Sequence, residues 1–594
     1  MMIDAKNLHE MSNVVRAVAL RAVRTAKSGH IGIVLGAADI ITIIYALFLN
    51  PGTDRFVLSA GHGSAMLYAV LKLAGYKIGE LDSFRRLYGL PGHPEFGTDG
   101  VAATTGPLGQ GIANAVGMAI TEKHRGTNGR IYCLVSDGDL MEGVAQEAIA
   151  FAGRYHLDNL IVLWDNNGIS MDGAAQTDES VPGRMRAAGW TVHRANGNDF
   201  DEMYDAISAP SCAPRFIQCD TVIGQGSSLA NTPRAHGYDL PDSEIAAIID
   251  GLDSAHGRKL WRALAHTHKN ARAHRFASVP NVAAPVLSHF TSTREMSAAF
   301  LSRLMARGAD IMLGSADVGK STGVHVDTVR DITTNDFSGN YINYGVREHA
   351  MAAIMNGMAY SGLRAVGSAF LVFSDYMRPA MRLAALSGLP TVYVLTHDSV
   401  AIGQDGPTHQ PIEQLAGLRL IPNMNVFRPA SMAEVEWSWR TALSESNKPS
   451  CIVLSRQKIA CLGTVVAGRI DAGAYVTYRT GARRVRMTII ATGSEVPLAI
   501  AVARRLNISV QVVSMPSVGH FRETDTAYKE SMLQGRVIAI EAGATAPWFE
   551  FADDVIGLDE FGLSGPGDMV YRECGFDADA ITAAIRAKLK NVRL

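Results

Sequence analysis

Residues 131–167 read IYCLVSDGDLMEGVAQEAIAFAGRYHLDNLIVLWDNN, and this stretch decides the fold class. It contains two continuous apolar runs, 131–135 and 160–164, with a segment of helical pattern between them. Continuous apolar strands that alternate with helices are typical of a parallel sheet covered on both faces. Similar runs recur at 391–395 and 487–491. We therefore predict an α/β protein with several mainly parallel sheets flanked by helices.

The composition is that of a globular protein with a large core. Of the 594 residues, 47% are hydrophobic and 19% are charged. A chain of this length predicts two or three large domains. The formal net charge of −2 gives no electrostatic reason to propose a nucleic acid or an anionic membrane as partner. The six cysteines form no CxxC pair, which argues against a disulfide scaffold and favours a reducing compartment.

The sequence predicts neither a signal peptide nor a membrane span. The first residues include Asp4 and Glu10 and lack the basic-then-apolar order of a signal peptide. The most apolar early run covers only residues 40–49, whereas a span needs about 20 residues. We expect a soluble, cytoplasmic protein.

Two stretches have the composition of linkers. Residues 266–292 are first basic and then proline-spaced, and residues 462–486 change from glycine-rich to basic. We place domain boundaries near 285 and 465.

Polar turns follow the apolar runs at 131–135 and 160–164. A right-handed crossover would bring both carboxyl ends to one sheet edge, where open α/β folds bind ligands. Asp137-Gly138 follows the first run and Asn166-Asn167 the second. A carboxylate, an amide oxygen and a backbone carbonyl suit Mg²⁺, and Gly138 lets a backbone N–H approach a phosphate. Asp-Gly and Asn-Gly are also ordinary turn dipeptides, so two plain turns remain the alternative.

These turns and further motifs resemble the transketolase family of thiamine diphosphate enzymes. The resemblance covers nearly the whole chain in order and is weakest at 238–290 and 460–485. It implies two thiamine diphosphate-binding folds, at 1–285 for diphosphate and metal and at 286–465 for the pyrimidine, and a smaller C-terminal α/β domain at 466–594. The motifs are SGH (28–30), GHG (61–63), PGHPE (91–95), TTGPLGQG (104–111), DNNGISMDG (165–173), YGVREHAM (344–351), FLVFSDY (370–376), THDS (396–399), QDGPTHQP (404–411) and LSRQ (454–457).

The resemblance implies a cofactor and a metal, thiamine diphosphate and Mg²⁺, with Ca²⁺ or Mn²⁺ as substitutes. The implied metal ligands are Asp137, Asn167 and the carbonyl of Ile169. The implied cofactor contacts in the first domain are His62, Gly106, Leu108, Gly138, Asn167 and His236, with Leu108 wedging the cofactor into its bent shape.

The chain departs from the family pattern at five places. Ser136 stands where the family usually has glycine, and its hydroxyl is expected to cap the following turn. Ile31 stands where proline is common, and Gln404 replaces a common glutamate. The loop 227–240 around His236 also differs, and residues 238–290 are shorter than in many members, which bears on closure over the cofactor and on its retention.

Glu348 lies near the start of a predicted helix over 346–360 that is apolar on most faces. Its carboxyl is either a first-turn acid facing the helix dipole or a buried acid with a raised pKa. In similar enzymes the matching acid donates a hydrogen bond to N1′ of the aminopyrimidine. The resemblance therefore implies a catalytic and cofactor-binding role for Glu348.

Phe370, Phe373 and Tyr376 are spaced by three, which by itself is typical of the core face of a short helix. The resemblance instead implies that they form the pocket for the aminopyrimidine ring. Phe373 would stack on that ring, an arrangement worth about 0.5–1.5 kcal/mol beyond area burial.

Six of the 18 histidines lie in motifs rich in Gly, Pro or Asp. A lone loop histidine is usually a surface residue, but several that converge on a cleft could move the protons of sugar hydroxyls near neutral pH. By resemblance, His30, His236 and His409 line the reacting carbons, and His93 and His397 lie near the substrate hydroxyls. Asp405 would recognise the C2 hydroxyl of the donor.

Substrate phosphate is implied to bind at Arg294, Ser321, His409 and Arg456. The planar fork of arginine gives paired, charge-assisted hydrogen bonds to phosphate, although any one of these arginines could be an ordinary surface residue. At Ser321 the chain has Gly319-Lys320-Ser321 where the family often has Thr-Pro-Ser.

The resemblance implies transfer of a two-carbon ketol unit from a ketose phosphate such as xylulose 5-phosphate to ribose 5-phosphate or erythrose 4-phosphate, in the non-oxidative pentose phosphate pathway. It also implies a homodimer with active sites at the subunit interface. A 1-deoxyxylulose 5-phosphate synthase-like enzyme and a non-catalytic transketolase-like protein are the alternatives. The stretch 396–411 and the early histidines argue against the first, and the occupied catalytic positions argue against the second.

Overall fold

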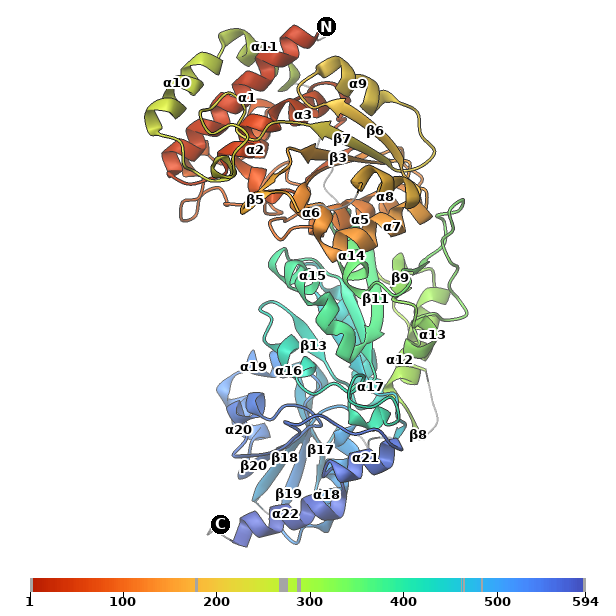
Figure 1. Cartoon of the computed structure of the whole chain (residues 1–594). Coiled ribbons are helices and arrows are strands. Elements are labelled where there is room, and N and C mark those ends of the chain that lie inside the picture. The colour runs from red at the N-terminus through yellow and green to blue at the C-terminus, as the bar shows by residue number, and fades with distance from the viewer. Residues whose placement is uncertain are drawn as a thin grey trace. The chain divides into compact units, whose positions relative to one another are not determined.

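A computed structural model of the chain describes residues 4–176, 180–265, 276–285, 290–460, 462, 465–481 and 484–590 (Figure 1). Parts of both predicted linkers, 266–275, 286–289, 463–464 and 482–483, lie outside the described residues. The chain divides into two compact units. The first consists of Met1–Arg275, Ile332–Gly339 and Ala353–Gly362, and the second of Phe276–Asp331, Asn340–Ala352 and Leu363–Leu594.

The first unit is built on a five-stranded parallel sheet in the order β1-β2-β3-β7-β6. The predicted runs at 131–135 and 160–164 are β2 and β3, and they pair in parallel with Ile131 opposite Leu160. Both predictions are therefore confirmed. The strands are β1 (Arg55–Leu58), β2 (Ile131–Ser136), β3 (Leu160–Asn166), β6 (Thr191–Asn196) and β7 (Arg215–Asp220).

Helices cover both faces of this sheet, with α1 and α3 on one side and α5 and α7 on the other (Figure 1). Side chains of β2 and β3 alternate between the faces, so Leu134 and Leu163 join the core beneath α1. The helices of this unit are α1 (Ala5–Ala26), α2 (Ile31–Gly36), α3 (Ala38–Ile43), α4 (Ser64–Leu73), α5 (Gln110–His124), α6 (Asp137–Met141), α7 (Gly143–Arg154), α8 (Val181–Ala187), α9 (Phe200–Ser208), α10 (Asp242–Leu252) and α11 (Ala255–Ala265).

The second unit contains two six-stranded sheets. The first is wholly parallel, in the order β10-β9-β11-β12-β14-β13, and the predicted run at 391–395 is its β12. Its strands are β9 (Ile311–Ser315), β10 (Tyr341–Asn343), β11 (Arg364–Phe370), β12 (Val392–Thr396), β13 (Asn425–Phe427) and β14 (Ser450–Leu454). Its helices are α12 (Thr293–Ala306), α13 (Gly319–Thr322), α15 (Ser374–Leu386), α16 (Gln414–Arg419) and α17 (Met432–Ser444). The helix α14 (Glu348–Tyr360) begins in the second unit, and its residues from Ala353 onward belong to the first.

The second sheet has the order β16-β17-β19-β18-β20-β21, parallel from β19 to β21 and antiparallel at the β16–β17 end. The predicted run at 487–491 is β18, where Ile489 packs into one core and Ile490 into another. Helices therefore cover both faces here too. The elements are β16 (Ala467–Arg469), β17 (Ala474–Arg479), β18 (Met487–Ala491), β19 (Val510–Ser514), β20 (Arg536–Ile540), β21 (Asp554–Ile556), α18 (Glu495–Arg505), α19 (Val518–Arg522), α20 (Thr526–Met532), α21 (Gly567–Glu573) and α22 (Ala578–Lys590).

Two local expectations were wrong. The helix predicted from 346 begins at Glu348, and Val346 is 75% exposed rather than buried, because Gly345 with φ +68° turns the chain just before the helix. The core-face interpretation of the aromatic triplet fails as well. Phe370 ends β11, Phe373 ends a 3₁₀ turn over Leu371–Phe373, and Tyr376 is 64% exposed.

Candidate functional site

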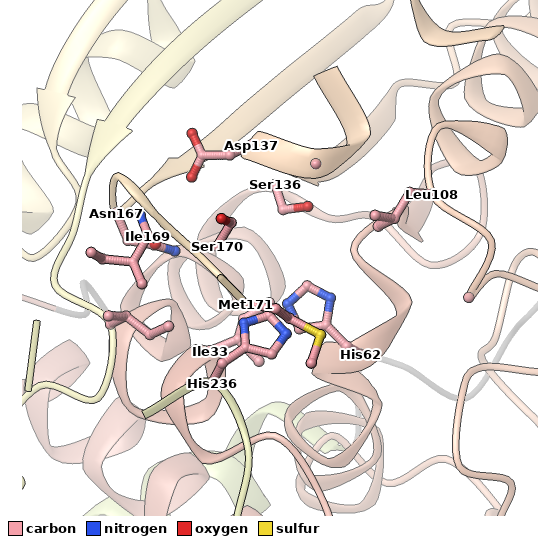
Figure 2. Close-up of a pocket in the computed structure, with 13 residues that line it drawn as sticks. Ile33, His62, Leu108, Ser136, Asp137, Asn167, Ile169, Ser170, Met171 and His236 are labelled. Atoms are coloured by element: carbon pink, nitrogen blue, oxygen red, sulfur yellow. Dashed lines mark hydrogen bonds between the residues drawn. The ribbon is translucent and has the colours of Figure 1, made fainter. Parts of the chain in front are cut away.

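A cavity of about 230 Å³ opens in the first unit at the carboxyl ends of β2 and β3. Figure 2 shows Asp137 at one end of this pocket and the rings of His62 and His236 at the other. Every cofactor and metal residue predicted for this part of the chain lines it. The lining residues are Ile33, His62, Gly106, Leu108, Ser136, Asp137, Gly138, Asn167, Ile169, Ser170, Met171, Ile223 and His236.

Asp137 is a buried carboxyl, and among the described residues no cationic side chain is found paired with it. Its Oδ1 accepts a hydrogen bond from Trp164 Nε1 at 3.2 Å. Burial and the neighbouring Asp165 carboxyl raise the pKa of Asp137 to about 7. Two carboxyls that disfavour each other's charge in a buried site are the setting that a bound cation stabilises.

Asn167 and Ile169 approach the pocket from the turn after β3. Asn167 Nδ2 donates to Asp165 Oδ2 at 3.2 Å, and its Oδ1 accepts from the Ile169 backbone N–H at 3.0 Å. The turn thus presents an amide oxygen and a backbone strand on the side of the pocket next to Asp137 (Figure 2). The oxygen donors present are those that Mg²⁺ prefers.

The turn that carries Asp137 is fixed by Ser136. Its side chain and Asp139 form a capping box at the start of α6, which confirms that the Ser136 hydroxyl caps this turn. Asp139, which the sequence did not single out, is fully buried and also accepts from the Gly109 N–H at 2.8 Å and Ser59 Oγ at 2.6 Å. It therefore ties the Leu108 loop to the β2 turn.

A side chain at position 138 would displace the end of the Leu108 side chain. A Cβ at 138 would lie 2.8 Å from Leu108 Cδ1. The backbone at Gly138 is thus bare, as a diphosphate-binding turn at a helix start requires.

Four histidines form a cluster beside this cavity, of which His62 and His236 line it. The ring of His30 has its centroid 5.3 Å from that of His62, 5.5 Å from that of His236 and 6.1 Å from that of His93. Burial lowers all four pKa values, to about 4 for His30 and about 3 for His62. The four rings are therefore neutral at pH 7, each with one donor and one acceptor nitrogen.

The loop that carries His236 is held by α2. The Ile31 backbone N–H donates to Gly237 O at 3.2 Å, and the Gly224 N–H donates to Gly32 O at 3.0 Å. A proline at position 31 would lack the first of these donors. The unusual Ile31 and the unusual loop 227–240 are thus joined by a hydrogen bond.

In the second unit, Glu348 is the first residue of α14 and is half-buried. Burial raises the pKa of its carboxyl, while a backbone hydrogen bond acts in the opposite direction. The acid thus lies in the first helical turn, and burial shifts its pKa upward, so features of both interpretations from the sequence are present.

The aromatic side chains near Glu348 in sequence form a row rather than a core face. The rings of Phe370 and Phe373 are stacked with centroids 6.1 Å apart, and Tyr376 lies 6.3 Å beyond Phe373. His397 packs on Phe370 at 3.7 Å, and His409 meets Phe373 edge-on at 5.2 Å. This row brings two of the predicted substrate histidines together with the three aromatics.

A group of cationic side chains adjoins these histidines. Burial lowers the pKa of His397 to about 3, and Arg456, Arg294 and His409 add to the effect. Arg294 Nη1 donates to the Ser321 backbone carbonyl at 2.8 Å, and the neighbouring Arg456 contributes to the lowered pKa of Arg294. The resulting positive region suits a phosphate.

For two of the predicted substrate residues, the structure gives less support to the assigned role. Asp405 is exposed in the loop before His409. Ser321 lies in the short helix α13 and lines a separate polar cavity of about 440 Å³. Their substrate roles stay predictions.

Three family models match the chain in order. They are "Transketolase, thiamine diphosphate binding domain" over residues 8–270, "Transketolase, pyrimidine binding domain" over 290–460, and "Transketolase-like TK C-terminal domain" over 473–577.

Individual proteins resemble the chain over nearly its full length. A transketolase of Streptococcus pyogenes is 39% identical over 95% of this chain and 88% of its own length. The solved transketolase of Leishmania mexicana has 33% identity and a TM-score of 0.89, covering 98% of this chain and 97% of its own. The transketolase of Pichia stipitis in complex with sedoheptulose 7-phosphate has 31% identity and a TM-score of 0.86, with the same coverage.

Proposed function

Because the chain belongs to the transketolase family, we propose that it is an active transketolase. It would transfer a two-carbon ketol unit from xylulose 5-phosphate or a similar ketose phosphate to ribose 5-phosphate or erythrose 4-phosphate. The observation that carries this proposal is the cavity at the ends of β2 and β3, where cation-suited oxygens and neutral histidines line one space.

The first unit would hold the diphosphate and the metal. Asp137, Asn167 and the Ile169 carbonyl are the proposed ligands of Mg²⁺, and the buried carboxyl of Asp137 with its raised pKa supports this assignment. The bare backbone at Gly138 and the rings of His62 and His236 would contact the diphosphate, with Gly106 and Leu108 beside them. Thiamine diphosphate, when bound, supplies a nucleophilic carbon and an electron sink.

The second unit would hold the aminopyrimidine. Glu348, whose raised pKa keeps it protonated more readily than an ordinary glutamate, is suited to donate a hydrogen bond to a ring nitrogen. The row of Phe370, Phe373 and Tyr376 offers aromatic faces for stacking.

The substrate would meet neutral histidines and fixed positive charge. His30, His236 and His409 would exchange protons with the reacting oxygens, while His93, His397 and Asp405 would contact other hydroxyls. Arg294 and Arg456, with Ser321 and His409, would bind the terminal phosphate. Burial and, to a smaller extent, the Arg456 charge lower the pKa of Arg294, which supports a shared anion at the two arginines.

We further propose the compartment, the pathway, the oligomeric state and the domain boundaries of the enzyme. It would act in the cytoplasm, in the non-oxidative pentose phosphate pathway, as a homodimer with shared active sites, and its domains would meet near 285 and 465. Within the part of the chain that the structure describes, none of the helices combines the length and apolar character needed to cross a membrane.

The first experiment supplies thiamine diphosphate, Mg²⁺, xylulose 5-phosphate and ribose 5-phosphate to the purified protein and follows sedoheptulose 7-phosphate. We expect product that disappears when the cofactor or the metal is omitted. A parallel reaction with pyruvate and glyceraldehyde 3-phosphate tests the synthase alternative. Absence of sedoheptulose 7-phosphate from protein that binds the cofactor would refute the proposal.

A further inference from the structure

An arginine that the sequence did not single out contacts the histidine cluster. Arg85 lies in the turn before His93, with a backbone φ of +56° and its N–H bonded to Leu90 O at 2.9 Å. Its Nη1 donates to Ser28 Oγ at 2.6 Å, and its Nη2 lies 3.3 Å from His30 Nδ1. A non-glycine residue with positive φ is uncommon, so a specific packing requirement holds Arg85 here.

The contact fixes where the His30 proton resides. A guanidinium has only donors and remains charged at any physiological pH. Nη2 can therefore only donate to Nδ1, which must present its lone pair. A neutral imidazole carries one proton, so that proton is on Nε2.

We propose that Arg85 is a positioning residue that fixes His30, beside the cavity, as the Nε2–H tautomer. A second contact agrees with this assignment. A hydrogen bond to the His62 backbone acts to raise the pKa of His30, as expected when the ring donates to a carbonyl. Because Nδ1 faces Arg85, that donor is Nε2.

The charges around His30 agree with a neutral ring. The groups that face it are Arg85, His62, His93 and His236. After burial, the Arg85 charge is the largest cause of the lowered His30 pKa, and it lowers the pKa of His93 as well. Among these groups there is no carboxylate to favour an imidazolium.

The neighbouring arginine supplies a matched control. Arg86 lies in the same turn, but its Nε donates to Asp82 O at 3.1 Å and its Nη2 to Thr25 O at 3.2 Å. Arg86 thus carries the same charge without touching a histidine ring in any contact that the structure describes. Substituting each arginine by methionine removes one charge and similar bulk from the same turn.

The direct test is a nitrogen NMR spectrum of the full-length protein with ¹⁵N-labelled histidine, in which the His30 signals are assigned by their loss in His30→Gln. We expect an unprotonated Nδ1 and a protonated Nε2 in the unsubstituted protein and in Arg86→Met. In Arg85→Met the two nitrogen shifts should move toward each other as the tautomers mix. A protonated Nδ1 in the unsubstituted protein would overturn the inference.

The kinetic test rests on the proposed function, whereas the NMR test does not, so failure of one is distinguishable from failure of the other. We expect Arg85→Met to lower kcat by about 10- to 100-fold, as when an orienting partner of a functional histidine is lost. The KM values should change much less. The acidic limb of the kcat/KM profile should move to higher pH, because removing a positive charge makes His30 easier to protonate.

Arg85→Lys separates charge from geometry. It keeps the positive charge, so the acidic limb of the kcat/KM profile should stay near that of the unsubstituted enzyme. Its kcat should lie between that of the unsubstituted enzyme and that of Arg85→Met. Arg86→Met should keep both kcat and the pH profile. Equal losses in Arg85→Met and Arg86→Met, or an unchanged pH profile in Arg85→Met, would show that Arg85 serves only the stability of the turn.

Discussion

At the scale of single residues, environment rather than residue type sets the chemistry. Burial raises the pKa of Glu348. In Glu541 burial is the largest single cause and acts in the same direction, but the charges and hydrogen bonds of its partners, Arg419 first, together outweigh it and lower the pKa to about 2. The surroundings thus shift the pKa of two identical side chains in opposite directions. A protonated glutamate can donate a hydrogen bond, while an ionised one can only accept.

Glu348 offers a sharp prediction at this scale. Glu348→Ala should lower turnover by about 10²- to 10⁴-fold, the range expected when a group that moves or shares a proton is removed. Cofactor affinity should change far less, because the diphosphate contacts lie elsewhere in the chain. The measurements are steady-state rates at saturating cofactor and calorimetric titration with thiamine diphosphate.

Glu530→Ala is the control for this prediction, since Glu530 is an exposed acid on α20. It should keep full activity. Turnover of Glu348→Ala within a factor of about three of that control would contradict the assigned role.

At the scale of elements, strands were predictable from the sequence because each is a continuous apolar run. β2, β3, β12 and β18 lie within one or two residues of their predicted bounds. The start of α14 was predicted two residues too early because the apolar pattern extends back to Val346. The chain turns at Gly345, which has a positive φ, and the helix begins only at Glu348. In the aromatic row, Phe370 ends β11, Phe373 ends the 3₁₀ turn at Leu371–Phe373 and Tyr376 lies in α15, so the spacing of three does not mark one face of a single helix.

The candidate site was predictable where residues lie in one motif and not where distant side chains meet. The Arg85–His30 contact joins residues 55 positions apart, and the Asp139–Ser59 bond joins residues 80 apart. No local pattern marks such pairs. The family resemblance supplied the ligand set around Asp137, whereas the residues that hold this set in place emerged only from the fold.

A network of buried ion pairs connects the two six-stranded sheets of the second unit. Arg428, just after β13, binds Asp398 at 2.8 Å and also pairs with Glu495 at the start of α18. Glu541, just after β20, pairs with Arg419 at 2.7 Å. Since Asp398 follows His397 directly, the C-terminal sheet supports the loop that carries a proposed substrate histidine.

This network predicts a defined acid sensitivity. A carboxyl whose pKa is lowered by folding stabilises the fold above its unfolded pKa, here about 4.5, and loses that contribution as pH falls toward 2. The contribution of Glu541 should be about 3 kcal/mol at pH 7, with about 2 kcal/mol lost by pH 3. The difference in unfolding free energy between the unsubstituted protein and Glu541→Gln should therefore shrink between pH 6 and pH 3, as measured by urea denaturation.

The matched control is Glu550→Gln, which removes a carboxyl paired with Arg522 at the surface. Exposed pairs contribute about 0–1 kcal/mol, so this variant should track the unsubstituted protein at every pH. A pH-independent difference for Glu541→Gln would show that its carboxyl is not held ionised by the network.

At the scale of the whole molecule, two large apolar side chains in the motifs of the proposed pyrimidine site are exposed. Val346, two residues before Glu348, is 75% exposed, and Tyr376, the last ring of the aromatic row, is 64% exposed. Large apolar side chains beside a ligand site are the kind of surface that a partner covers. In the homodimer that we propose, that partner would be a second copy of the chain, and the diphosphate half of one copy would lie against the pyrimidine half of the other.

Shared sites can be tested by mixing two inactive variants. Asp137→Asn would damage the diphosphate half, in the first unit, and Glu348→Ala the pyrimidine half, in the second. If each site combines halves from two chains, a mixed dimer has one doubly damaged site and one intact site. With random pairing, about half of the dimers are mixed, so co-expression should restore about one quarter of the unsubstituted activity.

The outcome depends only on which chain supplies each half. If both halves came from one chain, every site in the mixture would carry one damaging substitution and no activity would return. Each variant is first assayed alone to establish that it is inactive, and the mixed dimer is isolated through two different affinity tags. Isolated mixed dimers should then reach about half of the unsubstituted activity, because one of their two sites is intact. Inactive mixed dimers would refute the shared site even if the protein is dimeric, whereas sedimentation of a fully active monomer at nanomolar concentration would refute the dimer itself.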